Sequence, residues 1–213
     1  MKQYDPKTWA RKHHYAFFRD QSHPYFGLTS RVELGALHRV RASKIGTPFS
    51  LFLFALCQAA NQVPQLRQRI RLDGAAETVV EHDQVHPAFV VQAADDLFNF
   101  TTVSMTEKLA RFCDAVGEAS AARKEDPALA PFDGIRDDVL YCSCLPWIDF
   151  SHISHPIDTK IADSVPRFAW GQFQDDNTVS VNVQVHHALV DGRHIDAFFE
   201  ALQESLHALP SWI

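Results

Sequence analysis

Two adjacent histidines, His186 and His187, are the residues best suited to chemistry, because they stand where an alternating stretch gives way to a helical pattern. A neutral imidazole titrates near physiological pH and can take a proton from a hydroxyl, provided that another group fixes the ring in the right tautomer. The spacing leaves two interpretations of His187 open. It is either a general base or a core histidine whose hydrogen bonds are satisfied at the end of a strand.

The first element that must position the histidines is the stretch before them. Over residues 179–185 valine occupies every second position, with Ser180, Asn182 and Gln184 between the valines. This alternation predicts a half-buried strand. If it continues, His187 joins the valine face and lies in packed or partly enclosed surroundings.

The second positioning element is a helix after the histidines. Asp191 stands where an N-cap is expected, with Gly192 beside it. The apolar residues that follow recur at helical spacing, and they are Ile195, Phe198, Phe199, Leu202 and Leu206. The predicted order is therefore strand, His187, tight loop, Asp191 and helix.

The letters HHALVDG, residues 186–192, resemble the HHxxxDG active-site motif of the chloramphenicol acetyltransferases and of the related acyltransferase cores of 2-oxo-acid dehydrogenase complexes. The resemblance extends from Tyr4 to about Leu209 without a lipoyl or linker region, which favours the first family. It implies an α/β fold, a two-layer sandwich with a mixed β-sheet, in a single domain of residues 1–213. It also implies a homotrimer with active sites at the subunit interfaces, where His187 of one subunit faces the acceptor pocket of its neighbour.

The resemblance also implies the catalytic roles. His187 matches the general base, whose ring is held in the family by its own backbone carbonyl. The letters YCSCLPW resemble the family's S-x-L-P-W segment and place Ser143 at the serine that binds the oxyanion. One positioned donor of this kind contributes roughly 3 kcal/mol to the transition state of acyl transfer. In WARKHHYAFF, Arg11 matches the arginine that forms a salt bridge with the motif's aspartate, here Asp191, so both are expected to support the site.

Acceptor contacts follow from the same resemblance. Phe17 and Phe18 match an aromatic pair beside the acceptor, but the second position is commonly tyrosine, so Phe18 lacks a hydroxyl that could bind the acceptor. Phe98 or Phe100 matches a phenylalanine that lines the acceptor pocket, and Ile153 falls on the wall of that pocket.

On the donor side, Phe173 matches an aromatic residue that stacks on the adenine of coenzyme A, with aromatic packing in the sheet as the alternative. Trp147 is assigned to the same side. The resemblance thus implies acetyl-CoA as a cosubstrate, no permanently bound cofactor, and chloramphenicol O-acetylation that gives antibiotic resistance.

Two rival functions stay open. The first is an acetyltransferase for a different hydroxylated acceptor, which is favoured by Phe18, Ser22, Pro24 and His155 in the expected pocket. The second is a non-catalytic protein of the same fold that binds a small molecule.

Composition limits the remaining possibilities. A chain of 213 residues with 46% hydrophobic and 22% charged residues suits one globular domain with a substantial core. The formal net charge of -6 argues against nucleic-acid binding. The N-terminus lacks the apolar stretch of a signal peptide and no segment has the length of a membrane-spanning helix, which predicts a cytoplasmic protein without a membrane partner. His152, His155 and Asp149 lack the ligand spacing of a zinc site, so no metal is expected.

Several further elements are expected. An amphipathic helix is predicted over residues 6–19, and an apolar helix that belongs inside the domain opens at Pro48. Residues 123–138, rich in proline, charge and glycine, are expected to form an exposed loop. Residues 166–173 and 178–185 are predicted to form a hairpin that leads to the histidines.

Overall fold

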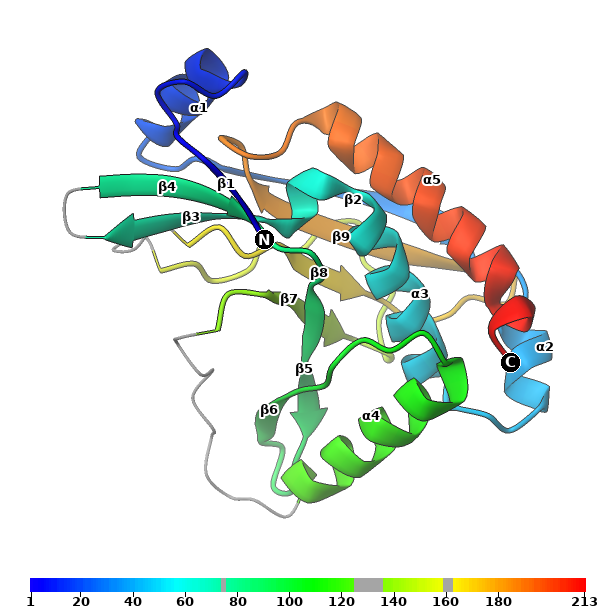
Figure 1. Cartoon of the computed structure of the whole chain (residues 1–213). Coiled ribbons are helices and arrows are strands. Elements are labelled where there is room, and N and C mark those ends of the chain that lie inside the picture. Colours follow the sequence, from blue (N-terminus) through cyan, green and yellow to red (C-terminus); the bar gives the residue numbers. More distant parts are fainter. Residues whose placement is uncertain (74–75, 125–135, 159–162) are drawn as a thin grey trace.

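The computed structural model describes residues 1–73, 76–124, 136–158 and 163–213. A mixed six-stranded sheet lies at the centre of this part of the chain, with strand order β2-β9-β8-β7-β5-β6 (Figure 1). Strand β7 runs parallel to β5 and β8, and the other neighbours are antiparallel. The strands are β2 Tyr25–Glu33, β5 His86–Gln92, β6 Phe98–Thr102, β7 Val139–Cys144, β8 Arg167–Trp170 and β9 Thr178–His186.

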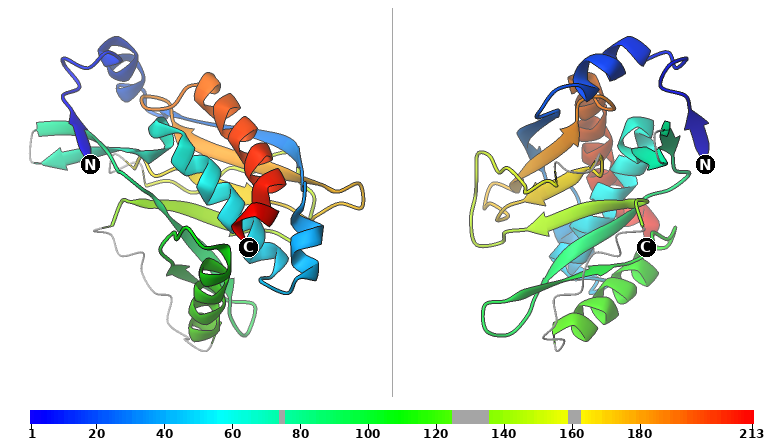
Figure 2. Two further views of the ribbon diagram at one scale, coloured as in Figure 1. Left: turned by 45° about the vertical axis from the view of Figure 1, so that its right-hand side comes forward. Right: turned by 90° about the vertical axis from the view of Figure 1, so that its left-hand side faces the viewer.

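Helices form the second layer of the sandwich, on one face of this sheet (Figures 1 and 2). They are α2 Leu37–Ala42, α3 Pro48–Gln62, α4 Leu109–Lys124 and α5 Gly192–Ala208, with 3-10 turns at Pro64–Arg67 and Leu209–Trp212. A smaller sheet with strand order β1-β4-β3 lies beside helix α1. Its strands are β1 Lys2–Tyr4, β3 Gln68–Asp73 and β4 Ala76–Glu81, and α1 spans Lys12–Arg19. The predicted α/β sandwich with a mixed sheet is thus confirmed.

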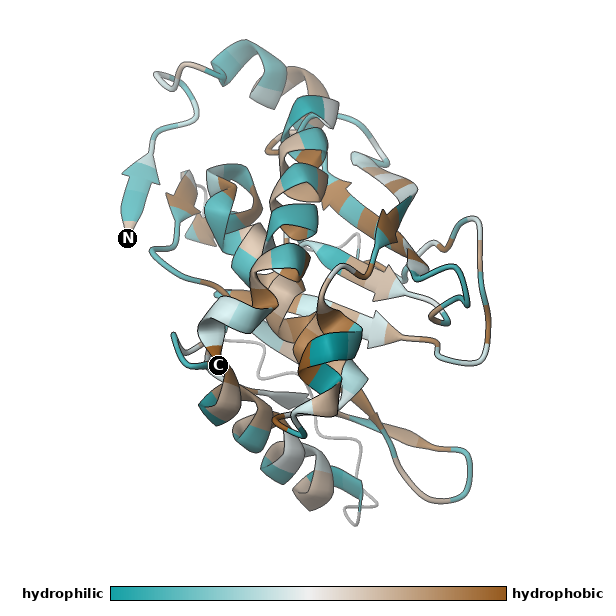
Figure 3. Cartoon of the chain, turned by 90° about the vertical axis from the view of Figure 1, so that its right-hand side faces the viewer, coloured by the Kyte–Doolittle hydropathy of each residue, from teal (hydrophilic) through white to brown (hydrophobic). Residues whose placement is uncertain are grey.

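Helix α3 is the buried centre of the helical layer. Pro48 occupies its first turn, where no N–H is needed, and the Thr47 hydroxyl accepts a hydrogen bond from the Ser50 N–H at 3.1 Å. Phe52 and Phe54 are both fully buried. Helix α5 packs beside α3 with an amphipathic sequence, and Figure 3 shows the hydrophilic and hydrophobic stretches alternating along it.

Strand β9 is buried on both faces, so the expectation of a half-buried strand was wrong. Its valines join the core below α3 and α5, where each contributes roughly 1.5–3 kcal/mol by burial. Its polar side chains face the segment after β7 instead of water. Ser180 donates to Asp149 Oδ1 at 2.7 Å, and Gln184 Oε1 accepts from the His155 N–H at 2.8 Å. Sequence alternation could not show this cover, because it comes from a distant loop.

The N-terminal helix is shorter than expected. It begins at Lys12 instead of residue 6, because residues 5–9 form a turn in which the N–H groups of Thr8 and Trp9 both donate to the Asp5 carbonyl. The loop predicted over residues 123–138 lies mostly outside the described residues, although Lys124 is the last residue of helix α4.

Candidate active site

His187 follows the last residue of β9 and is held at both its backbone and its ring. Its N–H donates to the Pro24 carbonyl at 2.7 Å, and its Nδ1 lies 3.1 Å from the Val190 carbonyl oxygen. A carbonyl can only accept, so Nδ1 carries a proton in this contact, and in the neutral ring the Nε2 lone pair is then free. The carbonyl belongs to Val190 and not to His187 itself, which corrects the expectation drawn from the resemblance. A neutral ring of this tautomer can act as a general base.

Two aromatic rings hold the imidazole from its sides. The Phe18 ring stacks on that of His187, with centroids 3.7 Å apart and planes 13° from parallel. Phe26 from β2 lies at a centroid distance of 4.5 Å. Phe17 packs edge-on against Phe18 at 5.1 Å and is 64% exposed. Phe26 was not predicted as a site residue, because its sequence position is that of an ordinary strand phenylalanine.

Asp191 connects this loop to helix α1. Arg11 donates to both of its carboxylate oxygens, at 2.6 and 3.0 Å, so the ion pair expected from the resemblance is present. These hydrogen bonds from Arg11 hold the pKa of Asp191 below its usual range. Asp191 Oδ1 is 3.5 Å from His187 Nδ1, which is too long for a strong hydrogen bond. The carboxylate therefore fixes the loop more than the ring. Arg11, Phe17, Phe18, His187 and Asp191 are called the histidine cluster below.

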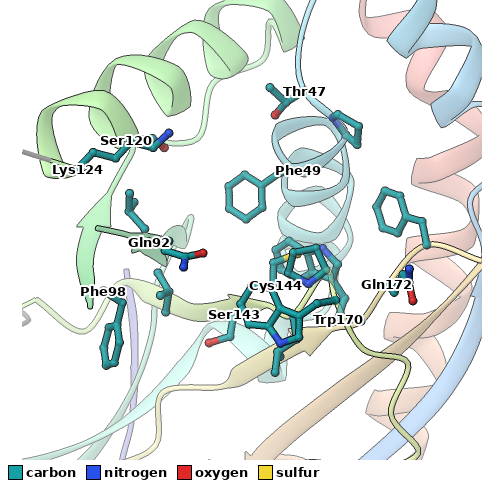
Figure 4. Close-up of a pocket in the computed structure, with 18 of the residues that line it drawn as sticks. Thr47, Phe49, Gln92, Phe98, Ser120, Lys124, Ser143, Cys144, Trp170 and Gln172 are labelled. Carbon is teal, nitrogen blue, oxygen red and sulfur yellow. The ribbon is translucent and has the colours of Figure 1, made fainter. Parts of the chain in front are cut away.

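A second group of predicted residues lines a cavity of about 1210 Å³ at the other end of the sheet, measured along the strands. This cavity is called the pocket below. Its walls come from the ends of β5, β7 and β8, the loops that follow them, and helices α3 and α4. Five predicted residues line it, namely Phe98, Ser143, Trp147, Ile153 and Phe173. Figure 4 shows Phe98 and Gln172 on opposite sides of the pocket, with Ser143 between them.

The pocket and the histidine cluster are well separated within one chain. Ser143 is level with Ala169 on β8, which is level with Asn182 on β9. His187 lies five residues further along the chain, directly after the end of β9. At the usual rise per residue and strand spacing, this is roughly 16 Å along the strands and about 10 Å across them, or on the order of 20 Å in all. No hydroxyl of Ser143 can reach a group that reacts at His187 of the same chain.

Comparison with known proteins identifies the family. The family model described as "Chloramphenicol acetyltransferase" matches residues 1–203. The chain belongs to the chloramphenicol acetyltransferase family. It is 28% identical over 203 residues to "Chloramphenicol acetyltransferase 2" of Escherichia coli and 29% identical over 209 residues to the protein of that name in Haemophilus influenzae. Each match covers 93% of this chain and 93% of the relative.

Solved structures agree on the fold. A chloramphenicol acetyltransferase superposes with a TM-score of 0.85 at 21% identity, covering 95% of this chain and 98% of the other. A dihydrolipoamide acetyltransferase of Azotobacter vinelandii superposes with a TM-score of 0.69 at 14% identity, covering 94% and 88%. Membership of this acetyltransferase family makes the protein an acyltransferase by class.

The pocket also contains residues that were not predicted. Phe49 follows the proline that opens α3, Trp170 ends β8, and Cys144 and Gln92 end β7 and β5. Burial raises the pKa of the Cys144 thiol to about 12, so this thiol is protonated and a poor nucleophile. Phe49 stands beside the proline that opens the predicted apolar helix, and nothing in the residue types of the four marked them as site residues.

Other expectations concern the surroundings of the site. Ile153 lines the pocket, whereas His155 is not among the residues that line it, and its N–H donates to Gln184 Oε1. Among the residues that the structure describes, no three His, Cys, Asp or Glu side chains are placed to hold a metal ion. None of the described helices is long and apolar enough to cross a bilayer.

Proposed function

We propose that this protein is a chloramphenicol O-acetyltransferase, which transfers the acetyl group of acetyl-CoA to a hydroxyl of chloramphenicol with His187 as general base. The observation that carries the proposal is the hydrogen bond between His187 Nδ1 and the Val190 carbonyl. In the neutral ring it leaves Nε2 unprotonated, which is the state that a base needs before it can accept a proton from an alcohol.

The reaction proceeds by direct attack. His187 Nε2 removes the acceptor proton while the acceptor oxygen attacks the thioester carbonyl, and the carbonyl oxygen becomes an oxyanion. The Ser143 hydroxyl donates to that oxyanion. The C–S bond then breaks, and the imidazolium returns the proton to the leaving coenzyme A thiolate. No acyl-enzyme forms on the protein.

A homotrimer brings the two parts of the site together. Because His187 and Ser143 are on the order of 20 Å apart in one chain, the base of one subunit acts on an acceptor held in the pocket of its neighbour. Both parts also expose large apolar side chains, with Phe17 64% exposed in the histidine cluster and Trp147 68% exposed in the pocket. Such exposure is expected of surfaces that a subunit or a substrate covers.

The remaining site residues are assigned either to coenzyme A or to the acceptor. In this proposal Phe173 and Trp147 contact the coenzyme A moiety at one end of the pocket. Phe98 and Ile153 contact the acceptor, while Phe17 and Phe18 of the neighbouring subunit close over it beside the base.

Phe18 favours a second candidate function within the same chemistry. Its ring covers His187 without a hydroxyl that could bind a polar acceptor. An acetyltransferase for a different, less polar alcohol fits this feature as well. A non-catalytic binding protein fits less well, because a binding protein has no use for a base whose tautomer is fixed.

Thiol release from acetyl-CoA, with chloramphenicol as acceptor, tests the proposal. The wild type should release coenzyme A, and His187→Ala should lower kcat by about 10²–10⁴-fold without loss of the trimer. His38→Ala, on the exposed side of α2, is the matched control and should behave as the wild type. No release by the wild type with chloramphenicol, but release with another alcohol, would favour the second candidate. No release with any alcohol would favour the binding protein.

The cellular part of the proposal is that residues 1–213 act as one domain in the cytoplasm and give resistance. Expression of the chain in a chloramphenicol-sensitive bacterium should raise the inhibitory concentration, and expression of His187→Ala should not.

A further inference from the structure

The turn that carries His187 is folded around the other histidine of the pair. Three consecutive N–H groups converge on His186. That of Ala188 donates to its ring Nδ1 at 3.2 Å, and those of Leu189 and Val190 donate to its carbonyl oxygen at 3.0 and 3.1 Å. Every backbone donor between His187 and Asp191 in this turn is therefore held by a single residue.

The surroundings of the His186 ring suit Nδ1 to accept the hydrogen bond from the Ala188 N–H. It is 2% exposed, and it packs edge-on against Tyr25 at a centroid distance of 5.0 Å. Burial, assisted by the Arg19 charge and the neighbouring His187, lowers the pKa of His186 to about 4, although Asp163 and Glu77 oppose the shift. The ring is neutral at physiological pH, and a neutral ring that accepts at Nδ1 carries its proton on Nε2.

The same turn aims the carbonyl that fixes the base. The Val190 N–H bonds back to the His186 carbonyl, and the Val190 carbonyl accepts from His187 Nδ1. The two adjacent histidines thus hold opposite tautomers, with the proton on Nε2 of His186 and on Nδ1 of His187. We propose that His186 is a positioning residue, whose ring and carbonyl fold the turn that selects the base-competent tautomer of His187.

Nitrogen NMR tests the tautomers in the wild-type protein without any substrate, and variants serve only to assign the signals. With ¹⁵N-labelled histidine at pH 7.5, His187 should show a protonated Nδ1 and an unprotonated Nε2, and His186 the reverse. Assignment by single substitution of each histidine identifies the signals. The opposite tautomer at either residue, or a mixture at His187, would overturn the proposal.

A matched pair of variants tests whether His186 selects the tautomer of His187. His186→Asn keeps an acceptor oxygen near the position of Nδ1, whereas His186→Leu keeps volume without an acceptor. The leucine variant should populate both His187 tautomers and lower kcat by roughly tenfold or more, with the KM of either substrate little changed. The asparagine variant should recover the single tautomer and most of kcat, and His38→Leu should change nothing. Equal behaviour of the leucine and asparagine variants would overturn the proposal.

The kinetic arm rests on the proposed function, but the NMR arm does not. If the protein transfers no acetyl group yet shows the two opposite tautomers, the proposed function fails and this inference stands. If the leucine variant does not fold, the tautomers of the wild type and of His186→Asn still decide the outcome.

Discussion

The histidine cluster and the pocket differ in how completely one chain builds them. In the histidine cluster His187 is already bonded to Val190 and stacked on Phe18, and the Arg11–Asp191 ion pair holds its loop. The pocket is open, and its Trp147 and Phe98 are 68% and 52% exposed. A base must be oriented before substrate arrives, whereas a pocket can be completed by the substrates and by a neighbouring subunit. Under the proposed function, each chain supplies a preassembled catalytic group and a binding site that is still open.

Mixing variant subunits is the strongest test of whether His187 and Ser143 act together from different chains. His187→Ala and Ser143→Ala homotrimers should each be strongly impaired. After they are unfolded and refolded together in equal amounts, roughly a quarter of the interfaces should combine an intact His187 with an intact Ser143 from different chains. Activity should then recover to about that fraction of the wild type, measured as thiol release.

Two controls accompany the mixing. Each variant refolded alone should stay inactive, and wild type refolded in the same way should regain its activity. If the mixture is no more active than its two components, both residues act on one substrate from within one chain, or Ser143 has no part in the reaction.

Ser143→Ala should have the next largest effect and would test the pocket alone. Loss of one oxyanion donor should lower kcat by about 10²–10³-fold with KM nearly unchanged, because the donor acts mainly in the transition state. Ser211→Ala, at the exposed C-terminal end, removes a serine hydroxyl without touching the pocket and should leave kcat unaltered. A rise in KM with constant kcat would instead make Ser143 a ground-state contact.

Asp191→Asn should have a smaller effect, spread over activity and stability. The variant keeps the shape but weakens a two-point ion pair whose side chains are 18% and 32% exposed, at a cost of roughly 1 kcal/mol after screening by solvent. Activity should fall by about tenfold as the loop loosens, together with a lower Tm. Arg11→Gln added to Asp191→Asn should cost little more, since the pair is already broken.

Asp83→Asn is the matched control, because Asp83 also pairs with a cation but is exposed and far from the loop. It should change neither kcat nor Tm appreciably. If Asp191→Asn lowered activity without lowering Tm, a direct chemical role for the carboxylate would be the better explanation.

Sequence predicted the histidine cluster better than the pocket for a physical reason. His187 and Asp191 lie within one short turn, where local hydrogen bonds decide the geometry. Even so, the Val190 carbonyl and the tilted Phe26 ring beside His187 were missed, because nothing in their residue types distinguishes them. The Arg11 partner came only from the resemblance, since 180 residues separate it from Asp191.

The fold was predictable where alternation or capping was strong, as in β9 and α3. It was wrong where burial depends on distant segments, as on the polar face of β9 beneath Asp149 and His155. The pocket depends on such long-range packing throughout. Ser143 was placed by its motif, but Phe49, Gln92 and Cys144 become neighbours only after the strands have paired.

The two regions should also respond differently to pH. The pKa of His186 falls from 6.5 to about 4 on folding, so below pH 6.5 the unfolded chain binds a proton that the folded chain does not. Stability should therefore fall as the pH decreases from 6.5 towards 4, by up to roughly 3 kcal/mol from this group. His194, in the first turn of α5, has its pKa lowered by burial and acts in the same direction.

No histidine is among the described residues that line the pocket, so acid should loosen the histidine cluster first. Hydrogen exchange at pH 7.5 and pH 5 should show protection lost at the amides of Ala188 and Val190 while those around Ser143 keep theirs. His186→Asn removes the titrating ring and should flatten the dependence of Tm on pH over the same range. Equal loss of protection in both regions would mean that they unfold as one unit, and that the preassembled cluster and the open pocket differ in exposure but not in stability.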